Sequence, residues 1–286
     1  MNDKYLETQT IINAIQGALV ADAYALGSHW IYDEGQLKNL PIDWEDLNAP
    51  QAMWHKGKEK GDFTHYGDHA KWLHEFIQMH NRFDPSLYAS FWAEKMEAYQ
   101  GYVDGSSRET LAILKNNPST LCGASSHDLS IIGRIAPLLL VSKSKEEFLA
   151  NTEMFVSLTH NSLVALKAAQ FFASVLFDVA LGATIADTLK HTAVDPLLAR
   201  AHGAAINSKG EESFNAIRTF GPACGVEGGF EGTIHVLLSY DDYQSAMIAN
   251  AQAGGDNAAR GMIIGMIMGA ALKEIPLAWK NGVKNL

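Results

Sequence analysis

Apolar residues recur every three or four positions along most of this chain. The first run is Ile12, Ile15, Leu19, Ala23 and Leu26, a spacing that places all five side chains on one face of an α-helix. Further runs with this period predict helices at residues 69–81, 86–99, 128–142, 145–158, 161–181, 183–192, 231–239, 242–252 and 256–272. Strand-like alternation is scarce, and its best candidate, 234–238, has flanks typical of helix. We therefore expect an all-α fold of about a dozen helices.

Residues at the ends of these runs support the boundaries. Asp84-Pro85 and Ser144-Lys145-Glu146-Glu147 are typical helix starts, the first with proline in the first turn and the second resembling a capping box. Residues typical of helix ends follow three periodic runs: Gly101, Gly182 and Pro276. The longest irregular segment is 41–64, and long loops in compact domains are often functional or mobile. No low-complexity linker divides the chain, so we expect residues 1–286 to form a single domain.

Three glycines share one face of the last predicted helix. Gly261, Gly265 and Gly269 lie four residues apart and, together with Ala258, form a smooth surface that lets another backbone approach closely. In a membrane such a face promotes helix dimerisation. Because this helix lies in a globular chain, we expect the face to serve tight internal packing instead.

Composition and charge narrow the functional classes. Apolar residues make up 47% of the chain and charged residues 19%, an ordinary balance for a globular protein. The formal net charge is −10, and lysine and arginine do not cluster. A nucleic-acid groove or an anionic membrane surface calls for a basic patch. We therefore expect a small-molecule partner, and neither nucleic acid nor membrane.

Targeting signals are not evident. The start, Met1 to Tyr5, lacks the basic residues and apolar run of a signal peptide. No stretch reaches the ~20 uninterrupted apolar residues of a membrane helix, the nearest being 262–272. Cys122 and Cys224 lie in no CxxC or metal-ligand spacing. We expect both to be buried, reduced thiols in a cytoplasmic protein.

The first helix carries an acid on its apolar face. Asp22 lies three residues after Leu19, so we expect it to be buried, where a carboxylate has to be paired, hydrogen-bonded or bound to a metal. It could contact a ligand or cap the amides of a neighbouring loop. The helix then breaks at residues that can form a pocket wall, with ligand-binding candidates His29, Trp30 and Tyr32.

A second cluster, 61–69, lies at a transition from loop to helix. His65 and His69 are four residues apart, which puts both imidazoles on one helix face in a spacing that can bind a transition metal. Tyr66 is a candidate to stack on a base or sugar. Asp68 is a candidate catalytic carboxylate and metal ligand. A carboxylate near a helix start is also favoured by the helix dipole alone.

Three later clusters precede predicted helices. Small residues before Asp128 expose free amides that suit an anionic group, and ordinary helix capping explains them equally well. Asp256 follows Gly-Gly, which permits close backbone approach, and it is the second candidate catalytic acid and metal ligand. The candidate ligand-binding residues of these clusters are Ser125, Ser126, Asp128, His160, Asn161, Asn257 and Arg260.

Taken in order, these segments resemble the ADP-ribosylglycohydrolase family over nearly the whole chain. The helix around Gly17-Ala18-Leu19-Val20-Ala21-Asp22-Ala23 is similar to the family's Gly-Asp-Ala helix, and 125–137 is similar to its central serine-containing segment. Thr159-His160 resembles its Thr-His junction. The segment from Gly254-Gly255-Asp256 to Trp279 resembles its closing Gly-Gly-Asp helix. The resemblance implies an all-α fold with a binuclear Mg²⁺ site that cleaves the glycosidic bond between ADP-ribose and an acceptor.

The chain departs from the family's metal ligands at each expected position. His29 stands about where the resemblance implies a glutamate, and Asp68 is the remaining acid near the implied Thr-Asp-Asp-Thr motif. Asp256 is kept from the implied Asp-Thr-Asp-Thr motif, but Ala258 replaces its second acid and Arg260 adds a cation. We therefore expect a weakened Mg²⁺ site with one ion or none, or a transition metal bound through His29, His65 and His69.

Two functions follow from these observations. The chain is expected to be a hydrolase that cleaves an ADP-ribose-type or related ribosyl glycoside, with Asp68 or Asp256 orienting a water molecule. Alternatively, it is a non-catalytic binder or structural member of a divergent branch, similar to the crystallin and selenoprotein-like members. The active cleft and the chemistry implied by the resemblance depend on Asp68 and Asp256 sharing one cavity.

Overall fold

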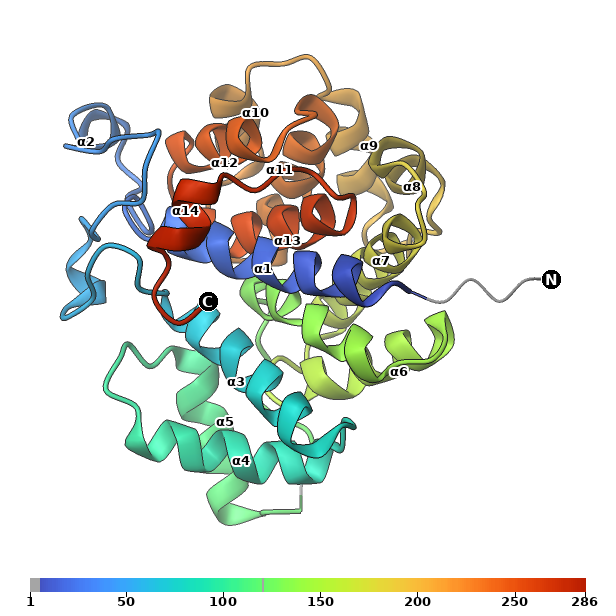
Figure 1. The fold of residues 1–286 in the computed structure, drawn as a ribbon. Helices are drawn as coiled ribbons and strands as arrows, with labels where there is room; N and C mark the ends of the chain where they lie inside the picture. The colour runs from blue at the N-terminus through green and yellow to red at the C-terminus, as the bar shows by residue number, and fades with distance from the viewer. Residues whose placement is uncertain (1–5, 120) are drawn as a thin grey trace.

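The computed structural model describes residues 6–119 and 121–286, and every regular element in these ranges is helical (Figure 1). The α-helices are α1 (Thr8–Ala25), α2 (Glu34–Lys38), α3 (His65–His80), α4 (Pro85–Ala98), α5 (Gly105–Asn116), α6 (Lys145–Ser157), α7 (Leu163–Ala180), α8 (Ile185–His191), α9 (Ala199–Asn207), α10 (Ser213–Phe220), α11 (Val226–Ser239), α12 (Tyr243–Gln252), α13 (Asn257–Ala270) and α14 (Leu277–Gly282). Three 3₁₀-helices join them: η1 (Met53–His55), η2 (Leu129–Arg134) and η3 (Ala136–Val141). The predicted all-α class is confirmed.

Helices α1 and α13 cross at the centre of the molecule, and glycines on both allow their close approach. A β-carbon on Gly17 would lie 2.1 Å from the carbonyl oxygen of Gly265, and one on Gly269 would lie 2.2 Å from that of Asn13. Any larger residue would therefore push the two backbones apart. This confirms that the glycine face of the last predicted helix serves internal packing.

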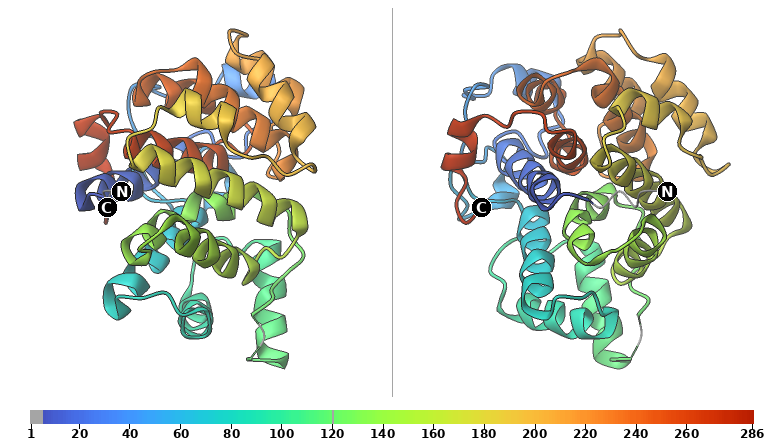
Figure 2. Two further views of the ribbon diagram at one scale, coloured as in Figure 1. Left: turned by 90° about the vertical axis from the view of Figure 1, so that its right-hand side faces the viewer. Right: turned by 45° about the vertical axis from the view of Figure 1, so that its right-hand side comes forward.

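The other helices surround this central pair. Helices α3, α4 and α5 occupy the lower part of Figure 1, and both views of Figure 2 keep this group apart from α9–α12 at the top. The 3₁₀-helices η2 and η3 pack between α1, α3 and α13. Helix α14 closes the outer side of α1, where the ring of Trp279 stacks on Tyr24 with centroids 4.1 Å apart. The N-termini of η2, α13 and α3 lie together near the C-terminal end of α1.

Several predicted boundaries are confirmed and others are wrong. The side chains of Asp84 and Ser144 cap α4 and α6 as expected. Residues 128–142 form η2 and η3 rather than one α-helix, because Pro137 has no amide hydrogen to donate. The possible strand at 234–238 lies inside α11. Short helices that the periodicity did not reveal are α2, α5, α9, α10 and α14.

Two further expectations meet different outcomes. Helix α7 is by length and composition apolar enough to cross a membrane, with a mean hydropathy of 1.6, but 56% of this stretch is buried inside the fold, as in a core helix. The expectation that both cysteines are buried is wrong, because Cys122 and Cys224 are exposed. The segment Met1 to Tyr5, on which the signal-peptide expectation rests, lies outside the described residues.

Candidate functional site

Four loops meet at the C-terminal end of α1. The backbone of Ile31 pairs with Gly255 in one isolated β-bridge, and Asp128 pairs with Gly225 in another. The amide of Asp256 also donates to the carbonyl oxygen of Pro222 at 2.8 Å. Segments 26–33, 123–128, 221–225 and 253–256 are therefore fastened to one another by backbone hydrogen bonds. We call this arrangement the four-loop junction.

The two glycines before Asp256 are required by this geometry. Gly254 and Gly255 have φ values of 69° and 64°, in the left-handed region that favours glycine. A β-carbon on Gly255 would lie 2.1 Å from the carbonyl oxygen of Pro222, and one on Gly254 would lie 2.6 Å from that of Ile31. The Gly-Gly pair thus lets two loops approach the start of α13, and this places Asp256 inside the junction.

The carboxylate of Asp256 is fully buried and held by three donors. Its Oδ1 accepts hydrogen bonds from His29 Nε2 and from the amide of Ala259, both at 3.0 Å, and its Oδ2 accepts one from the Tyr66 hydroxyl at 2.9 Å. Behind it, His29 Nδ1 lies 3.0 Å from Nε2 of His55. Burial opposes ionisation, but the charge of His29 and these hydrogen bonds outweigh it and lower the pKa of Asp256.

A second carboxyl group faces Asp256. Asp128 begins η2, is half-buried, and caps that helix by accepting the amide of Ser130 at 2.8 Å. Burial and the charge of Asp256 raise the pKa of Asp128 to about 7. Two neighbouring carboxyl groups thus have pKa values displaced in opposite directions, one ionised and one that binds a proton near neutrality.

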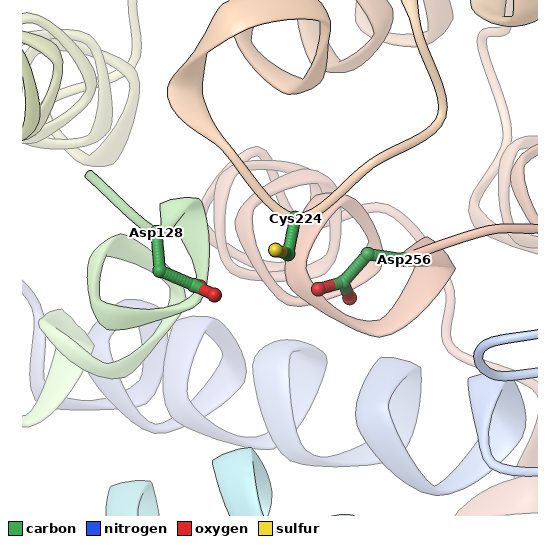
Figure 3. Close-up of side chains that lie close together, drawn as sticks. All are labelled: Asp128, Cys224 and Asp256. Carbon is green, nitrogen blue, oxygen red and sulfur yellow. The ribbon is translucent and has the colours of Figure 1, made fainter. Parts of the chain in front are cut away.

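Cys224 completes this cluster. One potential ligand atom from each of Asp128, Cys224 and Asp256 lies within 4.8 Å of the others, and the thiol lies between the facing carboxyl groups (Figure 3). Although Cys224 is exposed as a residue, partial desolvation of its thiol and the charges of the two aspartates raise the pKa of Cys224 to about 12. Residue spacing gave no signal for this cysteine, because the three side chains come from loops far apart in sequence. The tyrosine Tyr32, whose pKa is raised by burial and by the charge of Asp256, lies at the edge of the same cluster.

Other predicted site residues hold the junction together. Arg260 is fully buried and donates to Asn250 Oδ1 at 2.9 Å and to the carbonyl oxygen of Gly254 at 2.7 Å. Asn257 donates to the Ser28 hydroxyl at 2.6 Å. These side chains tie α13 to the loops before it. Their contacts therefore help to position Asp256 at the start of α13.

Asp22 holds the loop before α3. Its two carboxylate oxygens accept the amide and the hydroxyl of Thr64, at 2.7 and 2.6 Å. Of the two roles considered for this residue, the structure displays the capping one. Burial raises the pKa of Asp22 to about 7, despite these hydrogen bonds.

Asp68 and Asp256 have separate partners. Asp68 pairs with the Lys58 ammonium at 2.6 Å and accepts the Tyr99 hydroxyl at 2.5 Å. Neither partner contacts Asp256, whereas Tyr66, two residues earlier on α3, does. The acid of α3 that the sequence favoured is thus neutralised by a lysine, and the contact to Asp256 comes from a tyrosine.

The remaining candidates are distributed around the junction. Trp30 packs against His55 and His65, with ring centroids 5.3 and 5.4 Å apart. Ser126 accepts the amide of Asp128 at 3.2 Å, whereas Ser125 is exposed. His160 is buried and bonds to the Thr159 hydroxyl through Nδ1 at 2.8 Å. The amide of Asn161 donates to the carbonyl oxygen of Ala124 at 2.7 Å, which anchors the loop that carries the serines.

Comparisons with known proteins agree with this architecture. A model of the ADP-ribosylglycohydrolase family matches residues 3–285. Crystallin J1A and crystallin J1B of Tripedalia cystophora are each 23% identical to the chain, over 93% of its length and 89% of theirs. An ADP-ribosylglycohydrolase-related protein complex matches with a TM-score of 0.74 and 17% identity, over 99% of this chain and 94% of that one.

The contacts of Asp256 bear on the implied Mg²⁺ site. On α3 the residue that reaches Asp256 is Tyr66, which offers a hydroxyl group and no carboxylate. Mg²⁺ needs a near-octahedral set of oxygen ligands. Three hydrogen bonds already occupy the oxygens of Asp256, and Arg260 is buried nearby. These residues do not fit a binuclear Mg²⁺ site.

Proposed function

Since the chain belongs to the ADP-ribosylglycohydrolase family, we propose that it hydrolyses the glycosidic bond of an ADP-ribose-type or related ribosyl substrate, without a binuclear Mg²⁺ site. The observation that carries this proposal is the pair Asp128 and Asp256, close together and with opposite shifts of pKa. Paired carboxyl groups in different environments are the usual machinery of glycoside hydrolysis.

Asp128 is the proton donor in this proposal. With a pKa of about 7 it carries a proton in a large fraction of molecules at neutral pH, and it is the more accessible of the two acids. Asp256 is fully buried and ionised, so it stabilises the positive charge that develops on the ribosyl ring rather than attacking it. His29 and Tyr66 keep it ionised and oriented.

The reaction then balances with water alone. Asp128 gives its proton to the leaving atom of the acceptor as the bond from that atom to C1 of the ribose breaks. A water molecule adds its oxygen to C1, and the Asp128 carboxylate takes up the proton that this water releases. The acid is thereby restored, and the products are a free ribose hydroxyl and a protonated acceptor.

Leaving-group dependence tests the proposed proton donor. Metal-stripped protein is assayed on an ADP-ribosylated acceptor and on a riboside with a nitrophenolate leaving group, which needs no protonation. Asp128→Asn should lower kcat by roughly 10²- to 10⁴-fold on the first substrate and much less on the second. The exposed Asp241→Asn is the matched control. Equal losses on both substrates, or turnover that requires added Mg²⁺, would contradict the proposal.

A second candidate function is a structural role without turnover. Two observations favour it: the relatives are crystallins, and Asp68 is neutralised by Lys58. Under this alternative the purified protein binds ribosyl ligands weakly or not at all, and no substrate in the assay is turned over. The same assay therefore separates the two candidates.

A further inference from the structure

A second buried polar cluster lies beside the carboxyl pair and has no role in the proposed reaction. It comprises His65 and His69 on α3, Arg134 at the end of η2 and His160, with Asp104 at its rim. The first four of these side chains are at most 2% exposed. The Arg134 guanidinium also lies 5.3 Å from the centre of the Tyr66 ring, whose hydroxyl holds Asp256. The cluster and the carboxyl pair therefore share one wall.

Arg134 dictates where the protons of the neighbouring imidazole lie. Its Nη1 donates to His69 Nδ1 at 2.9 Å, so Nδ1 is an acceptor and the ring proton is on Nε2. Among the described residues, His69 Nε2 has no hydrogen-bond partner, and neither have Arg134 Nε or the two ring nitrogens of His65. At least three buried N–H groups, one from each residue, thus lack an acceptor.

The charge of Arg134 is also incompletely matched. Its two hydrogen bonds go to neutral groups, His69 and the Ser130 hydroxyl, and within the described part of the chain it forms no ion pair. The acid at the rim of the cluster, Asp104, has its Oδ2 3.7 Å from His65 Nε2, too far for a hydrogen bond. Unpaired buried donors around a cation are costly unless an acceptor reaches them.

We propose that His65, His69 and Arg134 form a subsite for a singly charged oxyanion, such as a phosphodiester or carboxylate group. A cation does not fit, because His69 Nε2 carries a proton and Arg134 is positive. A doubly charged anion fits less well, because Asp104 already contributes one negative charge. Trp30 and Tyr102, both partly exposed, pack on His65 at 5.4 and 5.2 Å between ring centroids.

The subsite also indicates the chemical class of the substrate, and this step rests on the proposed function. If the carboxyl pair cleaves a ribosyl bond, the oxyanion belongs to the same substrate, and this selects phosphorylated or otherwise acidic ribosides. Anion binding itself requires no turnover. The two proposals can therefore fail independently.

Nitrogen NMR of ¹⁵N-histidine-labelled full-length protein tests the subsite directly. Dimethyl phosphate and acetate are titrated in separate arms, with inorganic phosphate as the doubly charged comparison. We expect His69 in the Nε2–H form, and saturable shifts of His65 and His69 with dimethyl phosphate or acetate. Arg134→Lys and His65→Phe should each weaken that binding by about tenfold or more. The exposed His191→Phe is the control.

The opposite results overturn the inference without any variant having to fold. The inference is wrong if wild-type His69 carries its proton on Nδ1, or if none of the three anions gives a saturable shift. Either result would mean that these donors bind only water. If phosphate-free ribosides are turned over while no anion binds, the subsite is wrong and the hydrolase proposal stands. If anions bind and nothing is turned over, the subsite stands alone.

Discussion

Replacement of Gly255 by alanine tests whether the four-loop junction depends on close backbone contact. The new β-carbon would lie 2.1 Å from the Pro222 carbonyl oxygen, which already accepts the Asp256 amide at 2.8 Å. That carbonyl cannot withdraw without breaking the hydrogen bond. The left-handed φ of 64° adds a cost of roughly 1–2 kcal/mol for a residue with a β-carbon.

The clash and the backbone cost together set the expected loss. Overpacking a well-packed site costs about 1–3 kcal/mol, so Gly255→Ala should lower the free energy of unfolding by roughly 2–5 kcal/mol. Gly57 is the matched control, because its φ is 86° and a β-carbon there would meet no atom within 4 Å. Gly57→Ala should therefore lose only the backbone part, about 1–2 kcal/mol.

Urea unfolding at neutral pH, followed by circular dichroism, measures both variants. Equal losses for Gly255→Ala and Gly57→Ala would refute the close-contact reasoning, since only the first variant has the clash. If the junction positions the site, Gly255→Ala should also lower turnover at temperatures where the variant remains folded, whereas Gly57→Ala should not.

Three further predictions concern packing, protonation and metal. Gly17→Ala should lower the free energy of unfolding by about 1–3 kcal/mol, because the new β-carbon would lie 2.1 Å from the carbonyl oxygen of Gly265. Gly203→Ala should be neutral or stabilising, because a β-carbon at this helical position meets no atom within 4 Å. Urea unfolding that ranks the two variants the other way would contradict this reasoning. The folded state raises the pKa of Asp22 from 3.8 to about 7, so folding favours the protonated form of this residue. The free energy of unfolding should therefore fall by up to ~4 kcal/mol as the pH rises from about 4 through 7. Asp22→Asn should remove this component when unfolding is compared at pH values below and above this range. Added Mg²⁺ should leave the melting temperature unchanged, and a rise that follows its concentration would show that a site exists.

The fold class was predictable because the helices with the longest apolar faces make the core. The periodic run in α1 and the glycine face of α13 could both be recognised in the sequence, and these two helices cross at the centre of the molecule. Helix α10, which has eight residues, was not predicted. Residues 128–142 were misassigned because an apolar run with helical spacing does not reveal that the segment divides at Ile135 into two 3₁₀-helices.

Part of the candidate site could be predicted from local sequence, whereas contacts between distant segments could not. Asp256, His29 and Tyr66 were all singled out by their local sequence, and the structure brings them into contact. Asp68 was favoured because it is an acid near a helix start, but the sequence cannot show that Lys58 folds against it. Cys224 carries no local pattern, and backbone contacts between distant loops, the Asp128–Gly225 bridge and the Asp256–Pro222 hydrogen bond, place it beside the acids.

The titration of Asp128 tests the central claim most directly. Carbon NMR of labelled carboxyl groups follows it in the metal-free protein, with and without the charge of its neighbour. The account predicts a pKa of about 7 in the wild type and a clearly lower value in Asp256→Asn, because that substitution removes a charge that raises it. A wild-type Asp128 that titrates at the ordinary value for aspartate, or one that ignores the Asp256→Asn substitution, would contradict the claim that the two carboxyl groups act as a pair.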